Sequence, residues 1–328
     1  MPVTPEMQRL LVEEAEAELD DLTDVPPVEM RRRVDEAQAK FDRELGERLP
    51  VGGVKELTVP LPGRAVPIRL YHPTAVEGAR PPPVFIYFHG GGWIVGSLDG
   101  SDATCRELCE AAHCAVVSVD YRLAPEHKFP AAVDDAVGVT RWVADVRNGR
   151  SLDVDASRIA VGGASAGGNL AGVVAVDSRD SGAPRLRGQV LLFPVIDTAT
   201  DRASIRENAH GYGFEIEFLP VMWSTYLRSD ADKTDPRVAL LRTPHLRGLA
   251  PALVLTAEYD MLRDEGEEYA HRMASEGVDV TLHRYDGVVH SFPEYRTLAA
   301  KGRSATPEGR AAIAEVAGWL RTRFAADA

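Results

Sequence analysis

The chain has 328 residues and a net charge of −13, from 50 acidic and 37 basic side chains. This acidic balance disfavours binding to nucleic acid phosphates or anionic lipid surfaces. Hydrophobic residues make up 45% of the sequence and charged residues 27%, which is enough for a large globular core and excludes a disordered or fibrous chain. No run approaches about 18 apolar residues, and the opening segment is acidic rather than a secretory leader, so we expect a cytoplasmic protein without a membrane span.

The first fifty residues have a helical pattern. Thr4 is a candidate N-cap, with Pro5 at the first helical position. An apolar stripe at helical spacing follows, formed by Met30, Val34, Ala37, Phe41 and Leu45. We expect residues 1–50 to form cap helices over a core that begins at residue 51 with two short strands joined by a Pro-Gly turn.

From residue 84 onward, short apolar runs alternate with helical stretches. The runs are VFIYFH, AVVSVDY, RIAVGG, GQVLLFP, ALVLTAEYD and DVTLHRYDG. This alternation predicts an α/β fold with a mostly parallel sheet and helices on both faces. Residues 198–235 interrupt it and are too long for a simple crossover, so we expect a cap inserted into a core formed by residues 51–197 and 236–328.

A GxSxG sequence runs from Gly163 to Gly167, with Ser165 at its centre, and it follows a strand and opens a helix. Flanking glycines permit the sharp turn that exposes a nucleophilic serine hydroxyl. The alternative interpretation is an ordinary helix N-cap serine beside packing glycines. The position between strand and helix favours the nucleophile.

Upstream, His89 is followed by three glycines and Trp93, directly after an apolar strand. Consecutive glycines are entropically costly to order, and here they expose backbone N–H groups that suit the oxyanion of an acyl transfer reaction. A phosphate-binding loop is the competing interpretation, but the Lys and Ser/Thr of a P-loop are missing.

Asp260 ends a predicted strand and His290 lies in the loop after the last one, so the chain order is Ser, acid, His. A serine hydroxyl needs a base to take its proton, and the base needs a carboxylate to fix its tautomer. Asp264, Glu258 and Asp286 compete for the acid position. His290 is favoured as base over His283, which lies inside a strand, and over His89, which we interpret as a residue that orders the glycine loop.

Together the segments HGGGW, YRLAPEHKFPAAVDDA, GASAGGNL, EYDMLRDEG and YDGVVHSF resemble the hormone-sensitive-lipase-like carboxylesterases of bacteria, which have the α/β-hydrolase fold. The resemblance implies a triad of Ser165, Asp260 and His290. It also implies an oxyanion hole formed by the N–H groups of Gly91, Gly92 and Ala166. The cap would then close over an acyl pocket.

Two positions depart from the family pattern: Ala164 replaces the usual Asp, and Ser291 replaces the usual Gly after the histidine. Both lie beside expected catalytic residues. We expect them to affect local hydrogen bonding and backbone conformation without changing the triad.

The expected function is hydrolysis of short- to medium-chain carboxylic esters, a small-molecule substrate class, without metal or cofactor, with a homodimer as the candidate assembly. Candidate substrate contacts are Trp93, Tyr212 and Phe214. An amidase or acyltransferase with the same triad, a ligand-binding receptor on this fold, and a lyase without a nucleophile are the alternatives.

Three cysteines, Cys105, Cys109 and Cys114, lie within ten residues. Their spacing lacks the histidine partners of a zinc site. We expect buried thiols rather than redox or metal-binding groups.

Overall fold

One eight-stranded sheet organises the computed structural model, which describes residues 2–16, 25–45, 48–75, 80–294 and 306–326. The order across the sheet is β1-β2-β4-β3-β5-β6-β7-β8. Strand β2 is antiparallel to both β1 and β4, and the other neighbouring pairs are parallel. The strands are β1 (Gly53–Leu61), β2 (Arg64–His72), β3 (Pro83–Phe88), β4 (Ala115–Val119), β5 (Asp155–Ala164), β6 (Leu186–Leu192), β7 (Ala252–Tyr259) and β8 (Val280–Val289).

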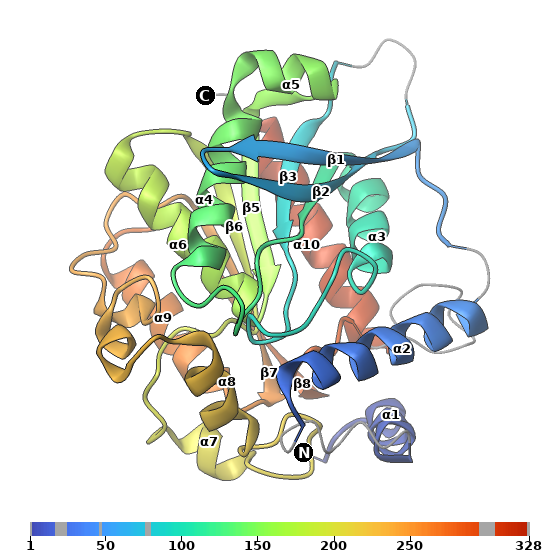
Figure 1. Ribbon diagram of the computed structural model, residues 1–328, viewed down its shortest axis with the longest axis vertical. Helices are drawn as coiled ribbons and strands as arrows, with labels where there is room; N and C mark the ends of the chain where they lie inside the picture. The colour runs from blue at the N-terminus through green and yellow to red at the C-terminus, as the bar shows by residue number, and fades with distance from the viewer. Residues whose placement is uncertain (1, 17–24, 46–47, 76–79, 295–305, 327–328) are drawn as a thin grey trace.

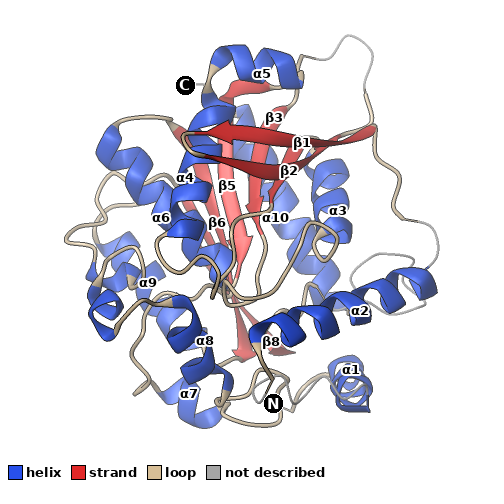
Figure 2. Cartoon of the chain, viewed as in Figure 1, coloured by secondary structure: helices blue, strands red, loops and turns tan. Residues whose placement is uncertain are grey.

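Helices cover both faces of the sheet (Figure 2). On one face lie α4 (Ala131–Ala144), α5 (Val146–Leu152), α6 (Ala166–Ser181) and α9 (Arg263–Ser275), and on the other α3 (Asp102–Ala112) and α10 (Pro307–Ala325). The residues of β3 alternate between two cores: Val84, Ile86 and Phe88 pack in the first, and Phe85 and Tyr87 in the second. Because both faces are buried, β3 is apolar along its whole length, as the sequence predicted.

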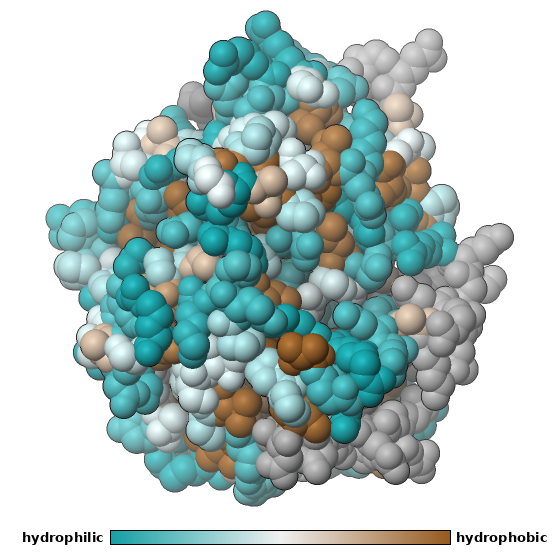
Figure 3. All heavy atoms as spheres, in the orientation of Figure 1, coloured by the Kyte–Doolittle hydropathy of each residue, from teal (hydrophilic) through white to brown (hydrophobic). Residues whose placement is uncertain are grey.

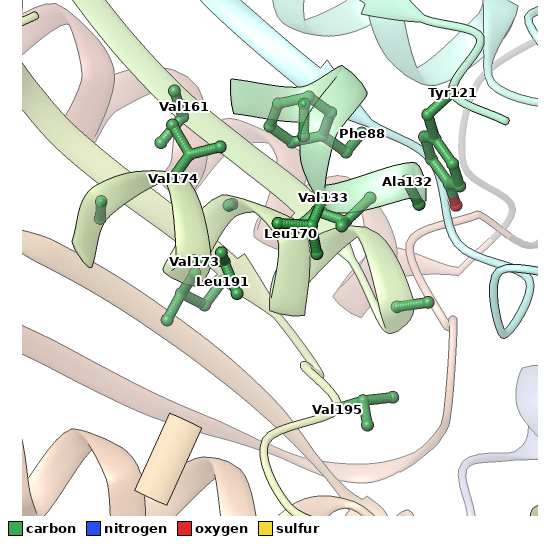
Figure 4. Packing of buried hydrophobic residues seen from close by; sticks show 14 of the residues in the cluster. Phe88, Tyr121, Ala132, Val133, Val161, Leu170, Val173, Val174, Leu191 and Val195 are labelled. Atoms are coloured by element: carbon green, nitrogen blue, oxygen red, sulfur yellow. The ribbon is translucent and has the colours of Figure 1, made fainter. Parts of the chain in front are cut away.

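Figure 4 shows part of the first core, where Leu170 and Val174 of α6 pack beside Val161 of β5 and Leu191 of β6. All four side chains are buried. Burial of this kind contributes roughly 1.5–3 kcal/mol per large aliphatic side chain. The core therefore fixes the junction between β5 and α6, which carries Ser165.

Four further helices gather beyond one end of the sheet (Figure 1). They are α1 (Pro5–Glu16), α2 (Pro27–Leu45), α7 (Ala203–Glu207) and α8 (Phe218–Tyr226); the short 3-10 helices η1 (Asp230–Thr234) and η2 (Leu240–Arg242) follow α8. Thr4 accepts a hydrogen bond from the Met7 N–H through its hydroxyl (3.4 Å), as expected of an N-cap. Of the predicted apolar stripe, Met30 is fully buried, while the side chains of Phe41 and Leu45 lie outside the described residues.

The three cysteines are free and buried, as predicted. Burial raises the pKa of all three thiols, that of Cys105 to about 12, so the thiols are neutral at physiological pH. Neutral, enclosed thiols behave as small apolar side chains.

Within the described ranges, no helix combines the length and apolarity that a bilayer crossing requires. The face of the molecule in Figure 3 is mostly hydrophilic, with hydrophobic residues in small separate patches.

Candidate active site

Ser165 occupies a sharp turn between β5 and α6. Its backbone has φ 53° and ψ −117°, a conformation that L-residues rarely adopt. The turn is held by the Ser165 N–H, which donates to the Leu192 carbonyl (2.9 Å), and by the Ser165 carbonyl, which accepts from the Val195 N–H (3.1 Å). The strained serine is therefore fixed by the end of β6 and by the segment that follows it.

The two outer glycines of the motif are explained by close backbone contacts. A Cβ atom on Gly163 would collide with the Phe88 carbonyl and with the backbone of Gly167. A Cβ atom on Gly167 would collide with the carbonyls of Phe88 and His89. Neither obstacle is a movable side chain, so only glycine fits at these two positions.

Asp260 and His290 follow directly on two adjacent parallel strands. Tyr259 at the end of β7 pairs with Val289 at the end of β8, so the next residues of both strands meet at the same edge of the sheet. The His290 Nδ1 atom lies 2.7 Å from Asp260 Oδ2. The other oxygen, Asp260 Oδ1, accepts from the Leu262 N–H (2.9 Å). A buried carboxylate so placed fixes the imidazole tautomer and leaves Nε2 on the opposite edge of the ring for proton transfer.

Two of the three rival acids, Asp264 and Glu258, have other partners. Asp264 accepts from the Ser204 N–H (2.7 Å) and pairs with Arg263 (2.9 Å). Glu258 accepts from the Gly287 N–H (2.7 Å). The histidine His283 lies on β8 beside Glu315 (2.8 Å) with a half-exposed side chain.

The glycine loop after β3 lies against Ser165, because β3 and β5 are neighbours in the sheet. A Cβ atom on Gly90 would lie 3.6 Å from the Cβ atom of Ser165. Gly91 and Gly92 have φ values of 106° and 59°, in the region that favours glycine. The predicted oxyanion donors Gly91, Gly92 and Ala166 thus belong to two backbone turns that lie beside each other.

His89 orders this loop. Its Nδ1 atom lies 2.7 Å from the Gly90 carbonyl, and its ring stacks on Tyr121 at 4.2 Å. The Tyr121 hydroxyl donates to the His89 carbonyl (2.8 Å). Burial lowers the pKa of His89 to about 4, so the ring is neutral at physiological pH and Nδ1 donates to Gly90.

Several residues around this site have strained backbone conformations. Trp93, Ser165, Phe193 and Ser291 are non-glycine residues with positive φ, at 59°, 53°, 36° and 60°. Each such conformation costs on the order of 1–3 kcal/mol and persists only when its surroundings enforce it. The value at Ser291 also explains why glycine suits the position after the histidine. At the other departure, Ala164 is fully buried at the end of β5.

The three candidate substrate contacts have different surroundings. Phe214 lies 4.8 Å from the His290 ring, centroid to centroid, and Tyr212 stacks on Tyr259 at 4.9 Å. Trp93 is fully buried and stacks on Tyr226 of α8 at 4.1 Å. Trp93 has no exposed surface and therefore belongs to the junction between the glycine loop and α8 rather than to a surface open to substrate.

Sequence reasoning missed several residues around the site. Phe193 packs edge-on against the His290 ring at 5.0 Å. Phe218 and Met222 of α8 cover Gly92, where a Cβ atom would lie 3.1 Å from each side chain. Phe218 and Met222 lie in the predicted cap insertion, residues 198–235, but the sequence did not indicate that they contact the glycine loop.

Glu265 connects the first turn of α9 to the segment after β6. Its Oε1 atom accepts from the N–H groups of Ile196 (2.7 Å) and Asp197 (3.2 Å), and Arg202 lies 3.8 Å from Oε2. Burial raises the pKa of this carboxyl to about 8, against the opposing effects of the two backbone N–H groups and Arg202. The same segment contains Val195, which binds the Ser165 carbonyl.

Replacing Glu265 by glutamine is expected to remove part of the pH dependence of stability. A carboxyl whose folded pKa is raised stabilises the fold at low pH, and this contribution is fully present below the ordinary pKa of 4.5 and is lost as the pH rises from there through about 8. Between pH ~5.5 and ~8.5 the wild type should lose about 2–3 kcal/mol of unfolding free energy relative to the Glu265→Gln variant, as measured by urea denaturation.

The control for this measurement is Glu268→Gln, because Glu268 also pairs with Arg202 (2.9 Å) but is largely exposed. That variant should follow the wild type across the same pH range. A Glu265→Gln variant with the pH profile of the wild type would contradict the account of this carboxyl.

One group of possible metal ligands occurs among the described residues, formed by His210, Glu215 and Glu217 in the segment before α8. Their ligand atoms lie within 4.8 Å of one another, and His210 and Glu217 are exposed. Exposed acidic groups of this kind are common without an ion, and none of the three contacts Ser165, Asp260 or His290 in the interactions described above.

Comparison with known proteins places this chain in a family. A family model described as alpha/beta hydrolase fold matches residues 85–294. Esterase LipI of Mycobacterium tuberculosis is 37% identical over 262 residues, covering 79% of this chain and 81% of that protein. The ethyl acetate hydrolase of Pseudomonas putida is 40% identical over 233 residues, covering 70% and 72%.

Solved structures of esterases have the same fold as this chain. An esterase of Pyrobaculum calidifontis has a TM-score of 0.88 and 36% identity, covering 99% of this chain and 100% of its own. An ester hydrolase from the metagenome of Lake Arreo, complexed with a bipyridine phosphonate derivative, has a TM-score of 0.89 and 35% identity, with coverage of 99% and 100%.

The fold defines an α/β hydrolase. More particularly, the chain belongs to the hormone-sensitive-lipase-like family of bacterial carboxylesterases, as its motifs indicated. It is a carboxylic-ester hydrolase.

Proposed function

We propose that Ser165, His290 and Asp260 form the catalytic triad of this esterase. The observation that carries the proposal is the 2.7 Å contact between His290 and a buried Asp260, at the sheet edge where Ser165 occupies a strained turn. Three residues from separate parts of the chain have the types and the backbone positions that nucleophilic acyl transfer needs.

In the proposed mechanism, the Ser165 hydroxyl attacks the ester carbonyl while His290 Nε2 takes its proton. Asp260 stabilises the resulting imidazolium through Nδ1. The N–H groups of Gly91, Gly92 and Ala166 bind the tetrahedral oxyanion. His290 then gives its proton to the departing alcohol, and water activated by the same histidine hydrolyses the acyl-enzyme.

The proposed acyl pocket lies beneath the cap segments, residues 1–50 and 198–235. Phe214 beside His290, with Phe218 and Met222 over Gly92, would bound it with apolar side chains. Tyr212, stacked on Tyr259, is placed at its margin in this proposal. Bulky residues so close to the reacting groups favour short- to medium-chain esters, and a relative named ethyl acetate hydrolase is consistent with small substrates.

We also propose that the protein acts in the cytoplasm on a small-molecule ester and assembles as a homodimer. Three free, buried cysteines without a disulfide fit a reducing compartment.

The test is hydrolysis of p-nitrophenyl esters from acetate to palmitate. We expect kcat/KM to be highest for the short to medium chains, and Phe214→Ala to shift the preference toward longer chains by about 4-fold per accommodated methylene, because each buried methylene contributes about 0.8 kcal/mol. The corresponding p-nitroanilides provide the comparison with amide hydrolysis.

An unchanged chain-length profile in Phe214→Ala would remove Phe214 from the acyl pocket. Faster cleavage of anilides than of esters would favour an amidase instead. Turnover of palmitate above butyrate would contradict the proposed substrate class.

A further inference from the structure

Helix α2 carries three consecutive arginines that behave differently. Arg32 pairs with Glu29 (2.5 Å) and Glu36 (2.6 Å), and Arg33 pairs with Glu29 (3.0 Å), all on the same helix. Arg31 instead reaches the core. Its Nε atom donates to the Ile94 carbonyl (2.6 Å), and its Nη2 atom donates to the Ala124 carbonyl.

The two carbonyls belong to residues that hold the glycine loop. The N–H groups of Ile94 and Val95 both donate to the Gly91 carbonyl at 3.0 Å. The Ala124 N–H donates to the Trp93 carbonyl at 2.8 Å. The Arg31 guanidinium therefore binds the carbonyls of Ile94 and Ala124. The N–H groups of these same two residues bind the carbonyls of Gly91 and Trp93, which lie on either side of Gly92.

Burial indicates which of these contacts matter energetically. Ile94 and Ala124 are fully buried, and a buried carbonyl that loses its donor is left without any hydrogen-bond partner, which is unfavourable. Arg31 also makes a bidentate pair with Glu126, from Nη1 to Oε1 (2.9 Å) and from Nη2 to Oε2 (2.5 Å), but the Glu126 side chain is 44% exposed, so solvent screens this pair. The two carbonyl bonds are thus the main connection between Arg31 and the loop.

The loop is also held from other directions. Tyr121 binds the His89 carbonyl, and Trp93 stacks on Tyr226 of α8. These contacts fix His89 and Trp93. Arg31 of the N-terminal cap contacts the turn formed by residues 91–95, through its bond to the Ile94 carbonyl.

We propose that Arg31 is a positioning residue that fastens cap helix α2 to the glycine loop and holds the N–H groups of Gly91 and Gly92 in place for the oxyanion. The role rests on the proposed function, since it assumes that these groups bind the oxyanion. It makes the N-terminal cap part of the catalytic apparatus as well as a cover for the pocket. Arg31 acts through the loop and does not touch the substrate.

The test compares Arg31→Ala and Arg31→Lys with Arg33→Ala, a matched control on the same helix. Displaced oxyanion donors weaken binding of the transition state, so kcat and kcat/KM for p-nitrophenyl butyrate should fall together by about 10- to 100-fold in Arg31→Ala. Lysine, a point charge without the planar fork, should restore only part of this loss. Arg33→Ala should stay within about 2-fold of the wild type.

A second readout separates positioning from general stability. A trifluoromethyl ketone adds to the active-site serine and places an oxyanion in the same hole, so its Ki should rise in proportion to the loss of kcat/KM across wild type, Lys and Ala variants. Glu126→Gln leaves both carbonyl bonds in place and should keep its kcat within about 2-fold.

The proposal is overturned if folded Arg31→Lys and Arg31→Ala keep wild-type kcat, or if the Ki of the ketone stays constant while kcat/KM falls. If Arg31→Ala does not fold, the Lys variant decides by the same two measurements. Loss of turnover in Ser165→Ala together with unchanged turnover in both Arg31 variants would refute this inference alone. Full turnover in Ser165→Ala would refute the proposed function itself.

Discussion

Replacing Ser165 by alanine is expected to lower kcat for ester hydrolysis by about 10⁶-fold. Without the hydroxyl no acyl-enzyme forms, and the oxyanion donors alone leave only a small residual rate. The strained turn should survive the change, because it is held by backbone bonds to Leu192 and Val195. Steady-state kinetics with p-nitrophenyl butyrate, together with thermal unfolding, measures both effects.

Ser178 provides the matched control for that experiment. It lies on the same helix α6, is buried, and its hydroxyl has no partner among the described residues. Ser178→Ala should leave kcat within about 2-fold of the wild type. Retention of more than roughly one part in a hundred of the activity by Ser165→Ala would remove this serine from the mechanism.

The second large effect is expected for Asp260→Asn, with a loss of about 10⁴-fold in kcat. An amide in place of the carboxylate can donate to Nδ1, which puts the imidazole proton on Nε2 and abolishes its function as a base. The amide also cannot stabilise an imidazolium. The Asp260 side chain is fully buried, so water cannot replace the lost charge.

Asp264→Asn is the comparison, because Asp264 lies nearby in the first turn of α9 and binds Ser204 and Arg263 instead of His290. Its kcat should fall by less than about 10-fold. A larger loss in Asp264→Asn than in Asp260→Asn would mean that the acid has been assigned to the wrong residue.

Much of the fold could be predicted because the strands are buried on both faces. Segments such as VFIYFH are apolar throughout, and they coincide with β3 and its parallel neighbours. The positions of Ser165, Asp260 and His290 relative to these strands were predicted for the same reason. Each follows a strand directly, and parallel strands bring their carboxyl ends to one edge of the sheet.

The glycine positions could be predicted because they record backbone constraints. Gly163 and Gly167 leave no space for a Cβ atom, and Gly91 and Gly92 have positive φ. A local steric requirement of this kind selects glycine at the position concerned, so it can be recognised in the sequence. Ser291, at φ 60°, shows that another residue can occupy such a position when the surroundings hold the backbone in place.

Contacts between distant segments could not be predicted. Arg31 lies 63 residues from Ile94, and nothing in helical spacing distinguishes it from Arg32 and Arg33. Likewise, Phe193 and Phe214 approach His290 from different loops. Such contacts depend on how the cap and the loops pack, which hydrophobic periodicity does not encode.

The most direct test of the central claim is covalent labelling with a p-nitrophenyl alkylphosphonate, followed by peptide mass spectrometry. The proposed mechanism predicts release of one p-nitrophenol per chain, one phosphonyl group on the peptide that contains Ser165, and complete loss of esterase activity. Label on another residue, or ester hydrolysis that persists after Ser165 is fully modified, would contradict the assignment of Ser165 as the nucleophile.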